Sequence, residues 1–361
     1  MEKLLKVGII GCGGIANGKH MPGLKNTGLC EMVAFCDIVV DRAHEAKRAY
    51  GTADAAVYED YKELLKDPTI DVVHVCTPNR SHSFISVDAL EAGKHVMCEK
   101  PMAINSAEAK KMLETAKKTG KKLTIGYQGR QADMSIYLHE SCENGEFGDI
   151  YFAKATALRR RGVPTWGVFL NEYEQGGGPL IDIGTHALDL TLWCMNNYKP
   201  KYCVGTTFHK LNNDTETANA FGDWEPEKFT VEDSAFGFVV MENGATIILE
   251  SSWALNMRIC PEAVTTICGT KGGADMVDGL HYNGVKKGRM YDNKIDMTTG
   301  GVAYYAGKSV SPDTREAYQW LTAIIEDKNP TVLPEQAYIV SCILEGIYES
   351  AKTGKPFYFN V

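Results

Sequence analysis

The chain has 361 residues, of which 44% are hydrophobic, and this length allows two domains with cores of ordinary size. Its net charge is −8 and its basic residues are scattered, which argues against nucleic acid as a partner. No stretch reaches the roughly 18 consecutive apolar residues of a membrane span, and a predicted strand follows Met1-Glu2-Lys3 directly. We therefore expect no membrane association and no signal peptide, and predict a cytoplasmic protein.

The first predicted strand, residues 4–10, runs into a glycine-rich segment that precedes a predicted helix. Gly11 permits a tight turn, Gly13 lets backbone N–H groups approach a pyrophosphate, and Ala16 allows close helix packing. The residues expected to contact a dinucleotide here are Gly11, Gly13, Gly14, Ile15 and Ala16. An ordinary strand, turn and helix without a ligand is the alternative.

A second apolar strand, residues 33–36, ends on Asp37 and Ile38, about 20 residues after the glycine-rich turn, as in dinucleotide-binding folds. The carboxylate of Asp37 is placed to accept hydrogen bonds from ribose hydroxyls. It would repel the 2′-phosphate of NADP, so NAD is the favoured cofactor. NADP remains the less favoured alternative, because Arg42 could reach a phosphate.

Three more short apolar runs, at 72–76, 95–98 and 123–125, alternate with amphipathic segments. One of these segments, 109–118, has a helix cap at Asn105 and a stop at Gly120. Strands that alternate with helices predict a doubly wound parallel sheet. We expect this first domain to span residues 1–125.

Polar residues follow two of these strands, at the sheet edge where such folds bind ligands. The first group is Cys76, Thr77, Pro78, Asn79 and His82, and the second is Glu99 and Lys100, followed by Pro101. Thr77 and Asn79 could instead only cap the next helix. Lys100 could donate a hydrogen bond or exchange a proton, or it could form a surface ion pair with Glu99.

Residues 126–361 are predicted to form an α+β domain with a mostly antiparallel sheet. Its predicted strands are 150–157, 202–208, 235–241 and 245–255, with helices at 182–196, 311–327 and 334–352 and a long loop around 298–301. Asn243-Gly244 predicts a hairpin turn in which both central residues have positive φ. The apolar content of 236–253 indicates an open sheet face, and hence a homodimer or homotetramer formed through this sheet.

A possible acid–base group lies on the predicted helix at 182–196. Asp182, His186 and Asp189 share one helix face, which makes His186 the best candidate for a general base. A buried His–Asp pair that only holds the helix to its sheet is the alternative.

The eleven cysteines and nine histidines do not predict disulfides or a metal. No Cys-x-x-Cys or His-x-x-x-His pair occurs, and Cys36, Cys76 and Cys98 lie within apolar runs. We expect reduced core thiols and no metal site.

Together, Gly11–Ala16, Asp37, Thr77–Asn79 with His82, Gly93–Pro101 and Asp182–His186 resemble the Gfo/Idh/MocA family (glucose-fructose oxidoreductase, inositol dehydrogenase and MocA-like proteins), over essentially the whole chain. The resemblance implies an N-terminal Rossmann dinucleotide-binding domain and a C-terminal α+β domain with a large, open-faced sheet. It implies that Lys100 lies beside nicotinamide and substrate, with Asp182 and His186 across the cleft. Further candidates for substrate contact are Tyr127, Arg159, Arg161 and Trp166, although arginine runs are usually surface and Trp166 could also cover the nicotinamide or fill the core.

The implied activity is NAD-dependent hydride transfer between nicotinamide and a secondary hydroxyl of a cyclic polyol, which could be a sugar, a glycoside or an inositol. In this hypothesis His186 removes the hydroxyl proton, Lys100 stabilises the developing charge on oxygen, and Asp182 orients His186 or binds a neighbouring hydroxyl. Alternatives are a redox-neutral glycoside-processing enzyme with tightly bound NAD, a non-catalytic sensor of NAD and sugar, and a structural subunit without cofactor.

Overall fold

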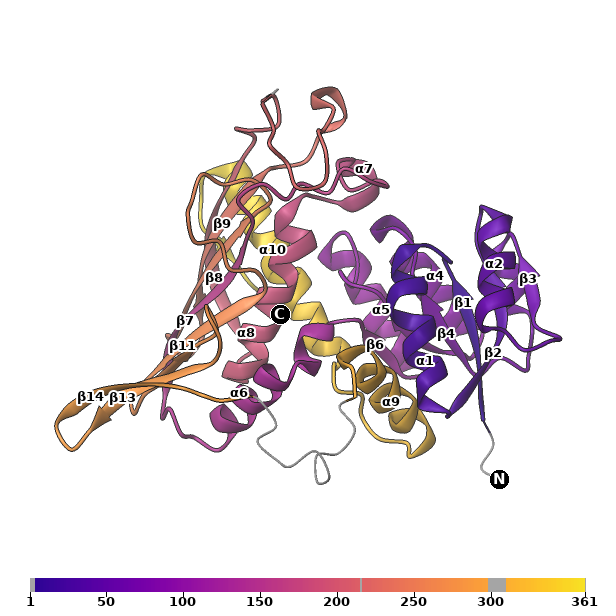
Figure 1. Cartoon of the computed structure of the whole chain (residues 1–361), viewed down its shortest axis with the longest axis horizontal. Helices are drawn as coiled ribbons and strands as arrows, with labels where there is room; N and C mark the ends of the chain where they lie inside the picture. The colour runs from indigo at the N-terminus through magenta and orange to yellow at the C-terminus, as the bar shows by residue number, and fades with distance from the viewer. Residues whose placement is uncertain (1–3, 215, 298–309, 361) are drawn as a thin grey trace. The chain divides into compact units, whose positions relative to one another are not determined.

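The computed structural model describes residues 4–214, 216–297 and 310–360. The chain divides into two compact units (Figure 1). The first includes the chain up to Gln131 and a later segment that ends at Tyr338, and the second starts at Ala132 and includes the segment from Ile339 onward. The loop predicted around 298–301 lies outside the described residues. No helix in the described part is long and apolar enough to span a membrane.

Six parallel strands form the sheet of the first unit, in the order β3-β2-β1-β4-β5-β6. They are β1 (Leu5–Ile10), β2 (Cys30–Cys36), β3 (Ala56–Tyr58), β4 (Val72–Val75), β5 (His95–Cys98) and β6 (Leu123–Ile125). The strand order reverses between β1 and β4, so their carboxyl ends mark the point where such sheets bind ligands. The predicted doubly wound Rossmann sheet is confirmed, with β3 as a strand that the sequence did not predict.

Helices pack around this sheet: η1 (Ala16–His20), α1 (Met21–Thr27), α2 (Val40–Tyr50), α3 (Tyr61–Leu65), α4 (Asn79–Glu91), α5 (Ser106–Thr119), η2 (Gln128–Gln131) and α9 (Pro312–Ile325). Helix α5 begins and ends as predicted. The Asn105 side chain accepts a hydrogen bond from the N–H of Glu108, and Gly120 ends the helix with a φ of +67°.

Helix α9 belongs to the first unit, although the sequence assigned all of 126–361 to the second domain. Gly23 of α1 makes the approach possible, because a Cβ there would lie 2.9 Å from the carbonyl oxygen of Asp313. Trp320 and Leu321 of α9 are buried in the same core as β1 and β2. Burial of these two side chains against a sheet far away in the sequence explains the assignment.

A nine-stranded sheet forms the second unit, in the order β14-β13-β12-β11-β7-β10-β9-β8-β15. Its strands are β7 (Ile150–Leu158), β8 (Pro200–Phe208), β9 (Ser234–Met241), β10 (Thr246–Ser252), β11 (Val264–Gly269), β12 (Gly273–Asp275), β13 (His281–Lys286), β14 (Arg289–Lys294) and β15 (Phe357–Tyr358). Every pairing except that of β7 with β10 is antiparallel. The prediction of a mostly antiparallel sheet is confirmed.

The hairpin between β9 and β10 is present, but the predicted turn type is wrong. Met241 pairs with Ala245 through its N–H, so the loop has three residues, and only Gly244 has a positive φ, of +86°. The Asn243 side chain accepts a hydrogen bond from the N–H of Ala245 instead. A left-handed glycine at the third loop position relieves Asn243 of the need for positive φ.

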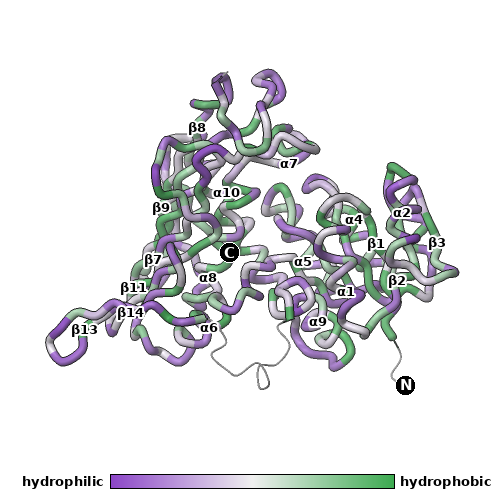
Figure 2. The backbone as a smooth tube through the Cα atoms, viewed as in Figure 1, coloured by the Kyte–Doolittle hydropathy of each residue, from purple (hydrophilic) through white to green (hydrophobic). Residues whose placement is uncertain are grey.

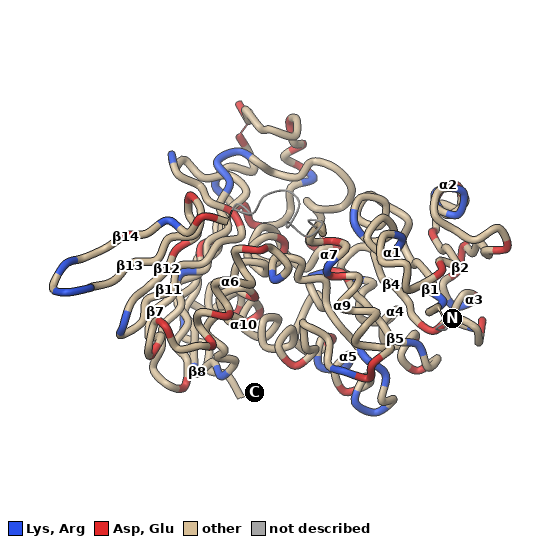
Figure 3. The backbone as a smooth tube through the Cα atoms, turned by 60° about the horizontal axis from the view of Figure 1, so that its bottom comes forward, with Lys and Arg blue, Asp and Glu red and all other residues tan. Residues whose placement is uncertain are grey.

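The helices of the second unit are α6 (Asp133–Glu143), α7 (Glu172–Gln175), η3 (Leu180–Gly184), α8 (Thr185–Met195), η4 (Pro226–Lys228) and, from Ile339 onward, α10 (Pro334–Thr353). Two glycines let α10 approach the sheet, because a Cβ on Gly205 or Gly237 would lie 2.6 or 2.5 Å from the Ile347 side chain. The β13–β14 hairpin extends the sheet, and its tip is hydrophilic (Figure 2) and rich in basic residues (Figure 3).

Candidate functional site

The glycine-rich turn follows β1 at the carboxyl edge of the parallel sheet. Gly11 has a φ of +88°, and a Cβ on it would lie 2.6 Å from the carbonyl oxygen of Cys76. Open space surrounds the Cβ positions of Gly13 and Gly14, whereas Ala16 is fully buried. Backbone N–H groups of this turn therefore border a region that no side chain fills, which fits the pyrophosphate of a dinucleotide.

Asp37 follows β2, and two backbone donors hold its carboxylate. Oδ2 accepts from the N–H of Cys12 and Oδ1 from the N–H of Val39, both at 2.8 Å. Two isoleucines nearby in the same motifs are unusually exposed, Ile38 at 87% and Ile15 at 41%. A fixed carboxylate and exposed aliphatic side chains fit the ribose and adenine of a dinucleotide.

The loop after β4 carries the predicted residues 76–79. Cys76 and Asn79 are buried, Thr77 is half-buried and Pro78 is exposed. Pro78 is the N-cap of α4 and makes no side-chain hydrogen bond to it. The Thr77 hydroxyl oxygen accepts a hydrogen bond from the Ser81 hydroxyl at 2.8 Å. Thr77 therefore does not cap the helix through its side chain, which was one of the two roles considered for it.

His82 has a different role from the cofactor contact that the sequence predicts. Its side chain is fully buried, with Nδ1 2.8 Å from the carbonyl oxygen of Pro101 and Nε2 2.8 Å from that of Thr77. Burial lowers the pKa of His82, and a neutral imidazole has one N–H, so it donates to one of the two carbonyls at a time. The ring joins the loop after β4 to the loop after β5.

Glu99 is also used inside the protein rather than toward a cofactor. Its Oε1 lies 2.7 Å from Lys19 Nζ and 2.8 Å from His20 Nε2, and its Oε2 accepts from the backbone N–H of Lys100 at 3.1 Å. Lys19 Nζ lies 2.9 Å from Glu316 Oε2 as well. Burial would raise the pKa of Glu99, but Lys19 and His20 hold it well below its usual value. This buried carboxylate anchors the backbone at Lys100.

Lys100 is half-buried at the end of β5, and its peptide bond to Pro101 is cis. Strand β5 pairs with β4, so Lys100, which follows β5, and Thr77, which follows β4, lie at the same edge of the sheet. Tyr127, a predicted substrate contact, is only 1% exposed. A side chain with so little surface has almost nothing to offer a ligand, so the burial of Tyr127 argues against that prediction.

Asp182 and His186 lie on adjoining helical segments of the second unit. The single helix predicted over 182–196 is in fact the π-helical turn η3 followed by α8, and such turns are frequent at functional sites. Asp182 is buried, and its Oδ2 accepts a hydrogen bond from Trp253 Nε1 at 3.0 Å. His186 is half-buried, whereas Asp189 is only 1% exposed. Asp189 is therefore more deeply buried than expected for a residue on the same helix face as Asp182 and His186.

Glu232 is a buried acid beside this segment that the sequence did not reveal. Its carboxylate accepts hydrogen bonds from the N–H of Gly178, the N–H of Leu180 and the Tyr348 hydroxyl, at 2.8, 3.2 and 2.8 Å. Burial raises the pKa of Glu232 to about 7, although these donors counteract the rise. Two of these donors, the N–H groups of Gly178 and Leu180, lie shortly before Asp182 in the chain. Glu232 therefore holds the turn that carries Asp182.

Glu232 should make the stability of the protein depend on pH. Its folded pKa of about 7 exceeds the ordinary value of 4.5, so its stabilising contribution is complete below pH 4.5 and is lost as the pH rises through 7. The free energy of unfolding of the wild type relative to Glu232→Gln should fall by roughly 2–3 kcal/mol between pH 5 and pH 8. Urea unfolding at both pH values measures this difference. Exposed Glu242 provides the control, since Glu242→Gln should show no such trend.

Arg159 and Arg161 follow β7 and are engaged with protein groups. Arg159 forms a bidentate pair with Glu262, at 2.7 and 2.6 Å, and donates to the carbonyl of Gly162. Arg161 donates to Asn256 Oδ1 at 2.8 Å and to a backbone carbonyl. These contacts show that both arginines stabilise the loop after β7. Their contact with substrate stays a prediction.

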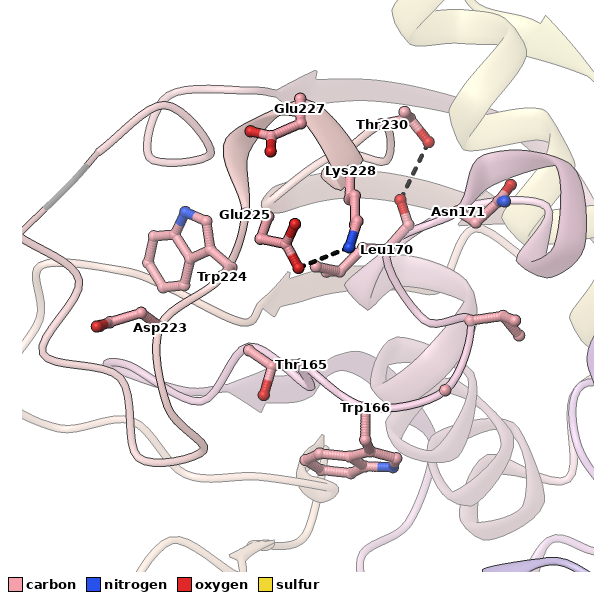
Figure 4. Close-up of a pocket in the computed structure, with 12 residues that line it drawn as sticks. Thr165, Trp166, Leu170, Asn171, Asp223, Trp224, Glu225, Glu227, Lys228 and Thr230 are labelled. Atoms are coloured by element: carbon pink, nitrogen blue, oxygen red, sulfur yellow. Dashed lines mark hydrogen bonds and ion pairs between the residues drawn. The ribbon is translucent and has the colours of Figure 1, made fainter.

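Trp166 is 52% exposed and lines a cavity of about 410 Å³ in the second unit (Figure 4). The cavity lies between the segments 165–171 and 223–230. Of the alternatives considered for Trp166, exposure excludes a place in the core. A volume in the range of about 300–1,000 Å³ is typical of small-molecule sites.

All eleven cysteines are free thiols, as the sequence predicts. Across residues 4–214, 216–297 and 310–360, we find no group of three or more His, Cys, Asp or Glu residues able to hold a metal ion.

Comparison with known families finds two matches along the chain. Residues 5–127 match the model of an oxidoreductase family with an NAD-binding Rossmann fold, GFO/IDH/MocA. Residues 136–275 match the C-terminal domain of GFO/IDH/MocA proteins.

Similar proteins include D-glucoside 3-dehydrogenase of Escherichia coli (strain K12), which is 36% identical over 353 residues, 97% of this chain and 96% of that protein. Inositol 2-dehydrogenase of Salmonella typhimurium (strain LT2) is 34% identical over 198 residues, 54% of this chain and 56% of that protein. The solved structure of levoglucosan dehydrogenase with NADH and levoglucosan shares the fold, with a TM-score of 0.83, 22% identity and coverage of 98% and 99% of the two chains.

Proposed function

The chain belongs to the GFO/IDH/MocA family of NAD-binding oxidoreductases, and from this premise we propose that it oxidises a secondary hydroxyl of a pyranose ring in a glycoside. The similarity to D-glucoside 3-dehydrogenase over 97% of the chain supports a glycoside, and supports the 3-hydroxyl as the group oxidised. Inositol 2-dehydrogenase matches only about half of the chain, so a cyclitol is less well supported.

The placement of Asp182 and His186 is the observation that carries this proposal. Trp253 fixes the Asp182 carboxylate, and Glu232 fixes the turn on which it lies. His186 follows on α8 and remains partly exposed. An imidazole on a rigid element, near a fixed carboxylate in the sequence, is suited to take a proton from a substrate hydroxyl. A protein that only sensed NAD and sugar would not need it.

In the proposed mechanism, His186, Lys100 and Asp182 have different roles in the removal of a proton and a hydride from the substrate. When bound at the Gly11 turn and Asp37, NAD supplies the hydride acceptor. His186 removes the proton from the reacting hydroxyl while the hydride leaves the same carbon. Lys100 stabilises the negative charge that develops on the oxygen, and Glu99 positions the backbone of Lys100. Asp182 positions His186 or binds a neighbouring hydroxyl.

Absorbance at 340 nm tests the function directly. Concentrated protein with NAD is offered a panel of pyranoses, glycosides and inositols, and we expect reduced cofactor with glycosides first. Reduction with inositols alone would reassign the substrate. Silence across the panel despite measured NAD binding would contradict the proposal and favour a sensor, and NAD retained through purification would favour a redox-neutral reaction.

Asp37 should set the preference for NAD over NADP. Its carboxylate is placed to accept hydrogen bonds from ribose hydroxyls and to repel a 2′-phosphate, and such charged hydrogen bonds are worth roughly 1.5–3 kcal/mol. Asp37→Ser should therefore weaken NAD binding by roughly tenfold or more and shift the ratio of the two dissociation constants toward NADP. Fluorescence titration with each cofactor measures this. Asp41→Asn, at an exposed carboxylate at the start of α2, is the control. An unchanged ratio in the Asp37 variant would remove Asp37 from cofactor selection.

We also propose that the second sheet mediates self-association as a homodimer or homotetramer. Several apolar side chains of this sheet are exposed, from 36% to 66%: Tyr151, Val204, Phe208, Phe238 and Tyr358. Exposed apolar residues gathered on one sheet typically mark an interface. A solution mass of one chain, measured by light scattering, would contradict this. The eleven free thiols support a reducing, cytoplasmic location.

A further inference from the structure

The cavity beside Trp166 contains neither Asp182 nor His186 among its lining residues, so it is separate from the acid–base segment. Hydrogen bonds connect the two segments that form its walls, 165–171 and 223–230, near both of their ends. Asn219 and Val163 exchange two hydrogen bonds, of 2.8 and 2.9 Å, and both the N–H and the hydroxyl of Thr230 donate to the carbonyl of Leu170, at 2.9 and 3.0 Å. The cavity is therefore built into the fold rather than left between loose loops.

Aromatic side chains form one part of the lining. Trp166 makes edge contacts with Phe221, at 4.9 Å between ring centroids, and with Phe169, at 5.7 Å. These contacts hold the indole in place, while half of its surface stays exposed. Trp224 is 5% exposed and donates from Nε1 to the carbonyl of Asn212, so it acts as a fixed wall. An exposed, immobilised indole is suited to stack on the apolar face of a sugar ring.

The remaining lining is rich in carboxylates. Three carboxylates, those of Asp223, Glu225 and Glu227, line the cavity together with one cation, Lys228, whose Nζ lies 2.6 Å from Glu225 Oε1 (Figure 4). Carboxylates accept hydrogen bonds from hydroxyl groups, and their excess negative charge repels an anionic ligand. The combination favours a neutral polyhydroxylated ring over a sugar phosphate or a sugar acid.

A chain of contacts connects the cavity to the acid–base segment within the second unit. Phe221, which packs against Trp166, lies 6.0 Å from the guanidinium of Arg159. Arg159 donates to the carbonyl of Gly162, and the N–H of Gly162 donates to the carbonyl of Trp253. The indole of Trp253 in turn donates to Asp182. Only a few side chains therefore separate the cavity from Asp182.

We propose that the cavity beside Trp166 is a subsite for a second, neutral pyranose ring, joined by a glycosidic bond to the ring that is oxidised. This inference rests on the proposed function and narrows it, because the preferred substrate becomes a glycoside of at least two sugar rings. Trp166 provides the stacking surface, and the carboxylates of Glu225 and Glu227 accept hydrogen bonds from ring hydroxyls.

Kinetics with substrates of one and two rings test the subsite. The ratio of kcat/KM for methyl β-cellobioside to that for methyl β-D-glucopyranoside should be roughly tenfold or more in the wild type. Trp166→Ala and Glu227→Gln should each lower this ratio severalfold, whereas Glu216→Gln, at an exposed carboxylate of the same segment outside the cavity, should preserve it. Circular dichroism melting verifies that the variants fold. A ratio near one in the wild type, or a ratio that neither cavity variant changes, would overturn the proposal.

Binding without cofactor separates failure of the subsite from failure of the proposed function. Trp166 is 52% exposed, whereas Trp193 is only partly exposed and Trp224, Trp253 and Trp320 are buried. The acrylamide quenching of tryptophan fluorescence that is lost in Trp166→Ala therefore reports on the surroundings of Trp166. Cellobiose should protect the fluorescence saturably, and cellobiouronic acid should bind at least roughly tenfold more weakly. If cellobiose protects the tryptophan fluorescence but no NADH forms, the subsite proposal stands and the proposed dehydrogenase activity is refuted. The subsite proposal would be overturned if cellobiose gave no protection, or if cellobiose and cellobiouronic acid bound with equal affinity. Protection by p-nitrophenyl β-D-glucoside alone would also overturn it, because the cavity would then bind an aromatic aglycone.

Discussion

Replacing His186 with alanine is expected to lower kcat by about 10²–10⁴-fold while the dissociation constant of NAD stays unchanged. The loss follows from removal of the proposed general base, since no other group is assigned to take the hydroxyl proton. NAD affinity should survive because the predicted nucleotide contacts lie in the first unit, whereas His186 lies in the second. Initial rates at 340 nm and equilibrium titration with NAD measure the two quantities separately.

The control for this experiment is His209→Ala, at an exposed histidine of the same unit. It should leave both kcat and NAD affinity unaltered. If His186→Ala keeps the wild-type rate, His186 takes no part in proton transfer, and the alternative of a histidine that only holds α8 to its sheet is correct. If NAD affinity falls with the rate, the loss reflects damage to the fold.

Replacing Gly11 with alanine should have the largest effect on NAD binding. The new Cβ would lie 2.6 Å from the Cys76 carbonyl oxygen, a backbone atom that cannot rotate away, and a φ of +88° is strained for alanine. We expect a loss of roughly 3 kcal/mol or more in the free energy of unfolding, and a loss of measurable NAD binding. Thermal melting and calorimetric titration with NAD measure the two effects.

Two other glycines separate strain from ligand contact. Gly28 has a φ of +66° but open space around its Cβ position, so Gly28→Ala should cost only about 1 kcal/mol and leave NAD affinity intact. Gly13 has open space and no strained φ, so Gly13→Ala should keep the melting temperature and still weaken NAD binding by roughly tenfold or more. Undiminished NAD affinity in both Gly11→Ala and Gly13→Ala would exclude the turn as the pyrophosphate site.

Features that depend on neighbours in sequence could be predicted. The strands from β1 to β6, apart from β3, follow from short apolar runs, and α5 follows from its cap at Asn105 and its stop at Gly120. The glycine turn and Asp37 have the geometry that their spacing indicates, because the strands around them fix their separation. Local chemistry determines these elements.

Features that depend on residues far apart in the sequence could not be predicted. Helix α9 joins the first unit because Gly23, almost 300 positions earlier, leaves room for Asp313. Arg159 finds its carboxylate partner 103 positions later, and Asp182 finds the indole of Trp253 71 positions later. No periodicity or motif encodes such pairs, since each depends on how the strands order themselves in the sheet.

The sequence motifs indicated which residues lie at the strand ends, but not which groups their side chains contact. His82 and Glu99 occupy the motifs that the sequence indicated, yet their side chains connect loops and anchor the backbone at Lys100 rather than face a ligand. A sequence indicates which residue types gather at a strand end. Whether a side chain turns inward depends on burial, which only the packed structure determines.

Deuterium transfer tests the central claim, that this protein moves a hydride from a ring carbon of a glycoside to NAD. Methyl β-D-glucopyranoside deuterated at every ring carbon is incubated with the protein and NAD, and the reduced cofactor is analysed by mass spectrometry. We predict one deuterium in each NADH formed. NADH without deuterium, or no NADH at all, would contradict the account.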